Sequence, residues 1–378
     1  MKRFALFLIL FPTLFACGPQ KSAKDINAWD NAVDTVVRKP LFDVSMKEGI
    51  TCYRIPALVT ATNGDLIAAI DERVPSCGDL KWSDNINIAI RRSTDNGHTW
   101  LPIETIVDFP LGQSASDPSM VVDEETGEIF MFYNYMDLIH AKNEYRFHVI
   151  SSKDNGKTWS EHRDITEQLS VAEMKDDFKF ITSGRANYTA DGKIIHTIVN
   201  LSRGLYVFGS DNHGKDWYFI DNPVKPADES KIIDLPNGKW MINSRVNNFG
   251  FRYRHISDDM GKTWTSEVDS ALTDPGCNGS IIKYSSVKNG DDKDRIVISQ
   301  IADPKGRNNL TIRLSYDNGK TWAYSKSLYP LGAAYSSMTV LKDGNIAIAY
   351  EKDGYSTNEI AIFSLAWLTD GQDKGIKK

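Results

Sequence analysis

The stretch Ser93-Thr94-Asp95-Asn96-Gly97-His98-Thr99-Trp100 decides how this sequence folds, because close versions of it return along the chain. Its pattern, S-x-D-x-G-x-T-W, describes a tight turn. The aspartate can accept backbone N–H bonds, the glycine supplies a positive φ, and the tryptophan folds back as an apolar plug. The other copies are SKDNGKTW at 152–159, SDDMGKTW at 257–264, SYDNGKTW at 315–322 and the degenerate SDNHGKDW at 210–217. Such a repeat predicts an array of similar β-hairpin units.

A second periodic feature indicates how many of these units there are. It is a turn dipeptide that contains glycine and is flanked by alternating apolar residues. The dipeptides lie at 63–64, 126–127, 191–192, 237–238, 289–290 and 343–344. Each predicts a β-hairpin, and most are followed by another alternating strand that runs into the repeated turn. One such sheet cannot bury both of its faces, so we predict an all-β fold, a six-bladed β-propeller of four-stranded antiparallel sheets. A β-sandwich or β-helix is the alternative and fits the unit length less well.

The composition agrees with a globular protein that binds no nucleic acid. The 378 residues are 41% hydrophobic and 11% aromatic, which is enough to bury a large core. The formal net charge is −6 and no basic stripe is present. The seven histidines are scattered without ligand spacing, so we expect no metal. We also expect a monomer.

The N-terminus predicts export. Met1-Lys2-Arg3 precedes a short apolar run at 4–15, as in a signal peptide rather than a membrane span. The run ends in Leu14-Phe15-Ala16-Cys17, which resembles the bacterial lipoprotein box, and Gly18 favours sorting to the outer membrane. We therefore expect an outer-membrane lipoprotein, periplasmic or at the cell surface, that touches the membrane only through a lipid on Cys17.

These features predict one folded domain on a tether. The predicted segments are a lipoprotein-type signal peptide at 1–17, a polar tether at 18–39, the propeller at 40–370 and a polar tail at 371–378.

Three cysteines remain if Cys17 carries lipid, so at most one intramolecular disulfide can form. Cys52 with Cys77 is the candidate pair. Three buried free thiols, Cys277 included, are the alternative.

Strand direction sorts the unusual polar residues onto one face of the predicted propeller. The start of each first strand and the end of each second strand lie at one axial face, while the glycine turns and the repeated turns lie at the other. Arg54, Asp117, Arg185, Glu229 and Tyr335 precede first strands, and Arg73, Asp79, Arg245, Arg307 and Glu351 follow second strands. Propellers bind ligands at the mouth of the central channel, so we predict that this face is functional and that the repeated turns are structural.

Tyr53-Arg54-Ile55-Pro56, ahead of five copies of the turn known as the Asp box, resembles the bacterial sialidases of glycoside hydrolase family 33. The resemblance extends over roughly residues 41–368. It implies an exo-α-sialidase, a glycosidase that hydrolyses terminal α-linked sialic acid from glycoproteins, glycolipids and oligosaccharides. The Asp boxes then become the hairpins of the propeller blades.

Members of that family bind the sialic acid carboxylate with three arginines, and Arg54, Arg245 and Arg307 match these positions. Each guanidinium offers a planar fork of donors, and such a cluster repels itself unless an anion is bound. The cluster therefore predicts an acidic ligand, against the alternative of three separately solvated charges. Glu351 matches the glutamate that orients the first arginine.

The resemblance implies that Tyr335 is the nucleophile and Glu229 the base that activates it. A neutral phenol suits sialic acid, because the anomeric carbon carries a carboxylate that would repel an anionic nucleophile. A free phenol has a pKa near 10, so it needs a neighbouring base. An ordinary buried tyrosine is the alternative reading of Tyr335.

The general acid/base is expected on the loop after the second strand, where the sequence offers Asp79 and Asp84. We choose Asp79, because Gly78-Asp79-Leu80 resembles the family loop, and keep Asp84 as the alternative. Arg73 and Asp117 match positions that in relatives contact the O4 region of the sugar. Arg185 receives no firm role.

The implied mechanism is a retaining double displacement with a tyrosine nucleophile, and it needs neither a metal nor an organic cofactor. Transfer to another sugar, as in a trans-sialidase or an intramolecular trans-sialidase, would share the first step. A non-catalytic sialoglycan-binding propeller is the alternative from another class.

Overall fold

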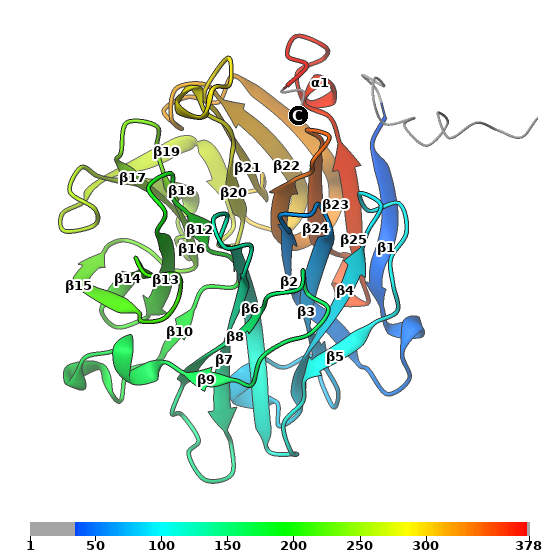
Figure 1. Ribbon diagram of the computed structural model, residues 1–378, viewed down its shortest axis with the longest axis vertical. Coiled ribbons are helices and arrows are strands. Elements are labelled where there is room, and N and C mark those ends of the chain that lie inside the picture. The colour runs from blue at the N-terminus through cyan, green and yellow to red at the C-terminus, as the bar shows by residue number, and fades with distance from the viewer. Residues whose placement is uncertain (1–34, 376–378) are drawn as a thin grey trace, which may run out of the picture.

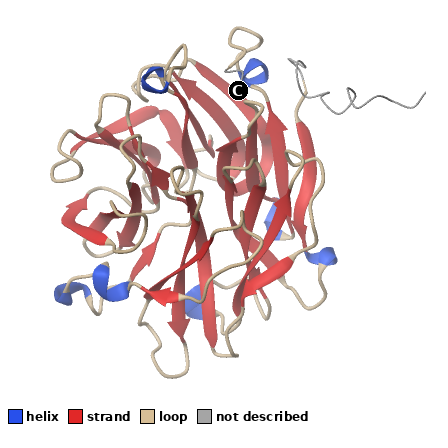
Figure 2. Cartoon of the chain, viewed as in Figure 1, coloured by secondary structure: helices blue, strands red, loops and turns tan. Residues whose placement is uncertain are grey.

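A computed structural model describes residues 35–375 and shows small antiparallel sheets arranged around a shared centre, as in a β-propeller (Figure 1). Strands dominate (Figure 2), and the α-helix α1 (Leu365–Leu368) has four residues. Within 35–375 no helix is long and apolar enough to cross a membrane. The predicted signal peptide and most of the predicted tether lie outside the described residues.

The strands form five hydrogen-bonded sheets in the described part of the chain. The first has β2 (Cys52–Thr60), β3 (Leu66–Arg73), β4 (Ile86–Ser93) and β5 (Glu104–Val107). The second has β6 (Gln113–Val122), β7 (Ile129–Asp137), β8 (Arg146–Ser152), β9 (Arg163–Asp164) and β11 (Gly184–Arg185). The third has β10 (Lys179–Ile181), β12 (Asn187–Tyr188), β13 (Ile194–Asn200), β14 (Gly204–Ser210) and β15 (Tyr218–Val224).

The fourth sheet has β16 (Ser230–Asp234), β17 (Trp240–Ser244), β18 (Gly250–Ser257) and β19 (Thr265–Asp274). The fifth has β20 (Ser280–Ser285), β21 (Arg295–Ile301), β22 (Asn308–Ser315), β23 (Tyr324–Val340), β24 (Ile346–Lys352), β25 (Thr357–Phe363) and β1 (Val37–Asp43). All strand pairs are antiparallel within 35–375 except the short β11, which lies parallel to β6.

The seven-stranded sheet corrects the expectation of six separate four-stranded sheets. β23 is 17 residues long; its first part pairs with β22 and its second part with β24. The last two predicted units are therefore joined through one continuous strand. A hairpin count along the sequence cannot detect this, because both units still have their own turns.

Both predicted ends of the domain need correction. β1 begins at Val37, before the predicted start at Pro40, and pairs with β25, so the first and last strands lie side by side. At the other end Asp373 is buried and accepts hydrogen bonds from Arg295 Nε at 2.8 Å and Nη2 at 3.0 Å. The first residues of the predicted polar tail therefore pack against the domain.

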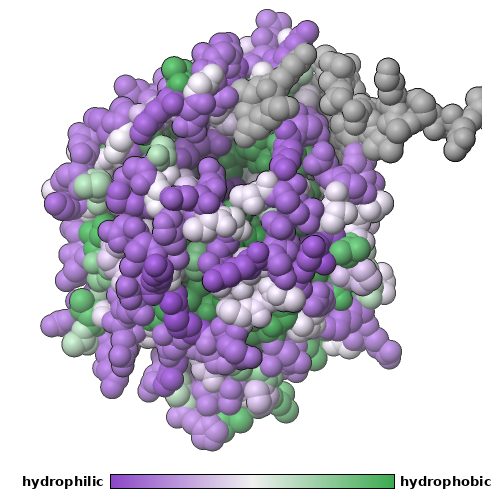
Figure 3. All heavy atoms as spheres, viewed as in Figure 1, coloured by the Kyte–Doolittle hydropathy of each residue, from purple (hydrophilic) through white to green (hydrophobic). Residues whose placement is uncertain are grey.

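Apolar side chains that alternate along the strands meet between neighbouring sheets and form the core. One cluster joins Val59 and Ile67 of the first sheet to Met120 and Met131 of the second. The face seen in Figure 3 is mostly hydrophilic, with apolar residues showing in separate patches. This distribution follows from the period-two pattern of the strands, which places one set of side chains between sheets.

The innermost strands of all five sheets line a central cavity of about 430 Å³. Its wall includes Val59 of β2, Val121 of β6, Tyr188 of β12, Ile233 of β16 and Val340 of β23. Further lining comes from β11 and β20. The sheets therefore surround one channel, and residues near strand ends of different sheets meet at its mouths.

The repeated turn has the hydrogen bonds that its residue types predict. In the copy at 315–322, Ser315 Oγ donates to Asp317 Oδ1 (2.8 Å) and accepts from the N–H of Gly319 (2.9 Å). Thr321 donates to Asp317 through its backbone (2.8 Å) and its hydroxyl (2.7 Å). Gly319 has φ +73°, and an added Cβ would lie 3.0 Å from Met241 Sδ of the neighbouring sheet. The turn therefore stabilises its own hairpin and contacts the next sheet.

Ser315→Ala should lower the free energy of unfolding by about 1–3 kcal/mol, because the buried N–H of Gly319 loses its acceptor. Urea unfolding measures this effect, and the matched control is Ser325→Ala at an exposed serine of β23. Equal stability of the two variants would show that the Ser315 hydroxyl does not hold the turn.

Candidate active site

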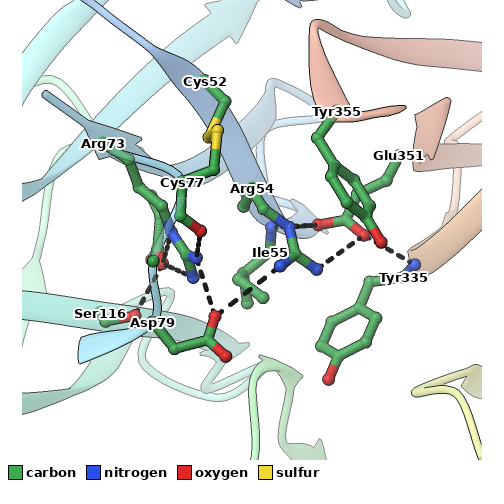
Figure 4. Close-up of polar contacts among 12 residues, drawn as sticks. Cys52, Arg54, Ile55, Arg73, Cys77, Asp79, Ser116, Tyr335, Glu351 and Tyr355 are labelled. Carbon is green, nitrogen blue, oxygen red and sulfur yellow. Dashed lines mark hydrogen bonds and ion pairs between the residues drawn. A yellow bond between two sulfur atoms is a disulfide. The ribbon is translucent and has the colours of Figure 1, made fainter. Parts of the chain in front are cut away.

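Glu351, at the end of β24, is fully buried and connects two sheets at one mouth of the channel (Figure 4). Its carboxylate accepts from Arg54 Nε at 3.0 Å and Nη2 at 3.3 Å. It also accepts from the backbone N–H of Ile55 (2.9 Å) and of Tyr335 (3.1 Å). Ile55 has φ +66°, and the β2–β3 register shifts there. One carboxylate thus sets the position of Arg54 and of the backbone at Tyr335.

Tyr335 lies where the β23–β24 register shifts, and its hydroxyl donates to Glu229 Oε2 at 2.5 Å. Arg245 Nη1 donates to the Tyr335 hydroxyl at 2.9 Å and also forms an ion pair with Glu229. Burial raises the pKa of Tyr335 well above its usual value and the charge of Glu229 adds to this, while Arg245 opposes it. The free site therefore holds a neutral phenol against a carboxylate that can take its proton.

The three predicted arginines surround the ring of Tyr335. The guanidinium carbon of Arg307 lies 5.3 Å from the ring centroid and that of Arg54 lies 5.6 Å from it. Arg307 Nη1 donates to the hydroxyl of Tyr355 at 3.2 Å, and Arg54 stacks on the ring of Tyr355 at 4.0 Å. Among the described residues no carboxylate lies within ion-pair distance of Arg307. The cluster therefore has one cation without an anionic partner.

Asp79 is held beside Arg54 by a disulfide-linked loop. Cys52 of β2 is bonded to Cys77, with their Cα atoms 5.8 Å apart, which confirms the candidate disulfide and leaves Cys277 as a buried free thiol. Asp79 Oδ1 accepts from Arg73 Nη1 at 2.8 Å and lies 3.7 Å from Arg54 Nη1. The Asp79 side chain is 72% exposed, so it faces the open side of the site.

The pKa of Asp79 lies below its usual value. Desolvation alone would raise this pKa, but the charge and hydrogen bond of Arg73 and the charges of Arg54 and Arg307 lower it by more. Asp79 is therefore a carboxylate in the free site. Asp84, the alternative, is exposed and forms no ion pair with Arg54 or Arg73 in the described part of the chain. The geometry favours Asp79.

Asp117 and Arg73 meet around a buried carboxylate that the sequence reading missed. Asp71 accepts from Arg73 Nη2 at 2.9 Å, from the Ser116 hydroxyl at 2.6 Å and from the N–H of Asp117 at 2.9 Å. Burial raises the pKa of Asp117, and the charge of Asp71 adds to it. Asp117 has φ +62°, a conformation that is uncommon outside glycine and is frequent at functional sites. The signal for Asp71 was an acid that directly follows the apolar run 66–70 within β3.

The structure connects nine of the ten residues that strand direction assigned to one face. They are Arg54, Arg73, Asp79, Asp117, Glu229, Arg245, Arg307, Tyr335 and Glu351, linked through the contacts given above. Arg185 is the exception, because it lines the central cavity and donates to the carbonyl of Met338 at 2.8 Å. Sequence reasoning also missed Tyr355, which contacts Arg54 and Arg307. It missed Asn278 as well, which donates to Glu229 Oε1 at 3.3 Å and accepts from Lys231 Nζ at 2.6 Å.

The site has no cluster suited to a metal. Within the described ranges no three His, Cys, Asp or Glu side chains are grouped so that they could hold a metal ion. The residues at the mouth of the channel instead combine cations, carboxylates and one phenol. This set can bind an anion and move protons.

Glu351→Gln should lower the free energy of unfolding by about 3–5 kcal/mol, because it leaves the charge of Arg54 buried without its partner. The glutamine NH₂ would also face the N–H groups of Ile55 or Tyr335. Urea unfolding checks this, with the exposed Glu124→Gln as the matched control. Similar unfolding midpoints for both variants would contradict the organising role of Glu351.

Comparisons with known proteins agree with this geometry. The family model described as BNR repeat-like domain matches residues 81–348. A sialidase of Micromonospora viridifaciens is 33% identical over 360 residues, which cover 86% of this chain and 53% of that protein. A sialidase of Bacteroides fragilis (strain YCH46) is 29% identical over 362 residues, covering 83% of this chain and 65% of the relative.

The fold comparison gives the same result. The solved structure of the Hadza microbial sialidase Hz136 superposes with a TM-score of 0.75 at 27% identity, over 85% of this chain and 67% of that one. The chain thus spans between about half and two thirds of the length of these relatives. The chain is similar to these sialidases, and because the family model matches more than half of the sequence, it belongs to the BNR repeat-like domain family.

Proposed function

We propose that the protein is an exo-α-sialidase that hydrolyses terminal α-linked sialic acid from glycoconjugates with retention of configuration. The observation that carries this proposal is the hydrogen bond of 2.5 Å between Tyr335 and Glu229 inside a group of three arginines. A phenol paired with a carboxylate can become a nucleophile without a metal. Arginines around that phenol select a substrate that carries negative charge beside the reacting carbon.

The pairing of the arginines supports a monocarboxylate ligand. Arg54 pairs with Glu351, while Arg245 pairs with Glu229 and lies 3.7 Å from Asp228. Arg307 forms no ion pair with a carboxylate in the described part of the chain. A bound sialic acid carboxylate would give Arg307 an anionic partner and accept the planar donors of the three guanidiniums. Binding in this way would place the anomeric carbon next to Tyr335.

Tyr335 would attack the anomeric carbon as Glu229 takes the phenol proton. The proton already lies in a hydrogen bond to Glu229, so the transfer needs no rearrangement. Arg245 contacts both groups and would stabilise the negative charge as it moves from Glu229 to the phenolic oxygen. The product of this step is a covalent tyrosyl-sugar intermediate, which water then hydrolyses.

Asp79 would protonate the leaving oxygen and later take a proton from the attacking water. In the free protein it is ionised, because the charges of Arg73, Arg54 and Arg307 outweigh the effect of its desolvation on the pKa. The negative charge of a bound carboxylate would offset the charges of Arg54 and Arg307. This would raise the pKa of Asp79, so substrate binding itself would prepare the acid. Arg73 and Asp117 would contact the O4 region of the sugar.

The finer features of fold and location belong to the same proposal. We regard the fold as a six-bladed propeller in which the last two blades share β23. The lipoprotein box at Cys17 supports an outer-membrane lipoprotein in the periplasm or at the cell surface, acting as a monomer. Sialylated glycoproteins, glycolipids and oligosaccharides would be the substrates.

The protein should release the fluorophore from an aryl α-sialoside, and Tyr335→Phe should lower kcat at least about 100-fold because the nucleophile is lost. The matched control is Tyr324→Phe, at the first residue of β23, which should retain activity. Product analysis by NMR separates free sialic acid from an anhydro sugar or a transferred one. A wild-type protein without turnover, or an active Tyr335→Phe variant, would refute the proposal.

Asp79→Asn should reduce turnover of a sialyl oligosaccharide far more than that of the aryl sialoside. A sugar alcohol needs a proton to depart, while an activated phenol does not. Asp84→Asn is the matched control on the same loop and should affect both substrates little. Equal losses on both substrates for Asp79→Asn, or a selective loss for Asp84→Asn, would assign the acid to another group.

A further inference from the structure

A buried lysine lies behind the Tyr335–Glu229 pair and is connected to it. Lys231 of β16 is two positions after Glu229, is 3% exposed and also lines the central cavity. Its Nζ donates to Asn278 Oδ1 at 2.6 Å. The amide nitrogen of Asn278 then donates to Ser183 Oγ at 2.9 Å and to Glu229 Oε1 at 3.3 Å. A chain of hydrogen bonds therefore runs from the channel to the proposed base.

The groups on both sides of Asn278 constrain the orientation of its side-chain amide. An ammonium group offers only donors, so a protonated Lys231 must face the oxygen of Asn278. The amide nitrogen then points away from Lys231, toward Glu229. A neutral lysine amine can accept as well as donate, so either the oxygen or the nitrogen of the Asn278 amide could then face it. The charge of Lys231 thus determines whether Glu229 meets a donor at its second oxygen.

The second oxygen of Glu229 has few other partners. Oε2 is engaged by Tyr335 and Arg245, on the side of the site. For Oε1, the described residues supply a single hydrogen-bond donor, Asn278. The hydrogen bond from Asn278 therefore limits the rotation of the Glu229 carboxylate. This rotation sets the direction in which Oε2 faces the Tyr335 hydroxyl.

The surroundings of Lys231 make its proton sensitive to pH near neutrality. No carboxylate lies within 4.0 Å of its Nζ in the described part of the chain. Burial lowers the pKa of Lys231 to about 7; the charge of Glu229 opposes this shift, and those of Arg252 and Arg245 add to it. The other titratable groups that act on Lys231 or feel its charge are Cys277 and His196.

Those two neighbours do not titrate in the same range. Burial raises the pKa of Cys277 to about 12, and it holds the pKa of His196 well below its usual value. Of these three groups, Lys231 is therefore the one that changes charge near neutral pH.

We propose that Lys231 and Asn278 are positioning residues that hold Glu229 in the orientation needed to take the Tyr335 proton, and that deprotonation of Lys231 releases this hold. The inference rests on the proposed function, in which Glu229 is the base. Both residues would act through Glu229 and not on the substrate itself. Activity should therefore fall on the alkaline side as Lys231 loses its proton, while binding through the three arginines continues.

The test measures kcat and KM on the aryl sialoside from about pH 5 to about pH 9 for the wild type, Lys231→Met, Lys231→Arg and Asn278→Ala. Lys231→Met should lower kcat about tenfold, with little change in KM, and should lack the alkaline fall near pH 7. Lys231→Arg stays charged, so it should keep activity and move the fall to higher pH. Asn278→Ala should match Lys231→Met, and the double variant should be no worse than either single one.

Lys283→Met is the matched control, because Lys283 lines the same cavity but pairs with Asp234 instead of Asn278. Its pH profile should equal that of the wild type. If Lys231→Met fails to fold, as checked by circular dichroism, Lys231→Arg and Asn278→Ala still decide the question. An unchanged kcat in Asn278→Ala, or a Lys231→Arg profile identical to the wild type, overturns this inference alone. A wild-type protein without activity instead overturns the proposed function.

Discussion

A buried carboxylate that must be satisfied by donors is the constraint on which this site depends. Glu351 is fully buried and accepts from the side chain of Arg54 and from two backbone N–H groups. A desolvated charge is tolerated only with such partners, so their positions are tightly coupled. Since Arg54 belongs to the first sheet and Tyr335 to the last, the same contact relates the two ends of the fold.

The rest of the site extends from this contact through alternating charges. Arg54 lies near Asp79, Asp79 pairs with Arg73, and Arg73 pairs with Asp71. On the other side Tyr335 is bonded to Glu229, which pairs with Arg245. Of the four arginines of the site, Arg307 is the one that forms no ion pair with a described carboxylate. An anion bound by Arg307 would lie next to a phenol that can react.

Three residues at or beside the site have backbone conformations that most side chains avoid. Ile55, Asp117 and Tyr355 all have positive φ, although none is a glycine. Each costs conformational energy that neighbouring contacts must offset, and such outliers are frequent at functional sites. The strain accompanies register shifts in β2, β6 and β23, which turn side chains toward the channel mouth. The remaining regular strands act as a rigid support.

The repeated octapeptide, the glycine turns and the direction of the strands were sufficient to predict a β-propeller and to assign nine site residues to one face, because these signals are local. The tertiary structure alone decided how β23 joins two units, that Arg185 lines the channel, and that Asp373 packs on Arg295. It also decided which buried polar groups support the site, namely Asp71, Asn278 and Lys231. Ser116 lies 45 positions from Asp71, and Asn278 lies 47 positions from Lys231. A buried polar group acquires its role from the groups that it faces, and the sequence alone does not place such distant groups side by side.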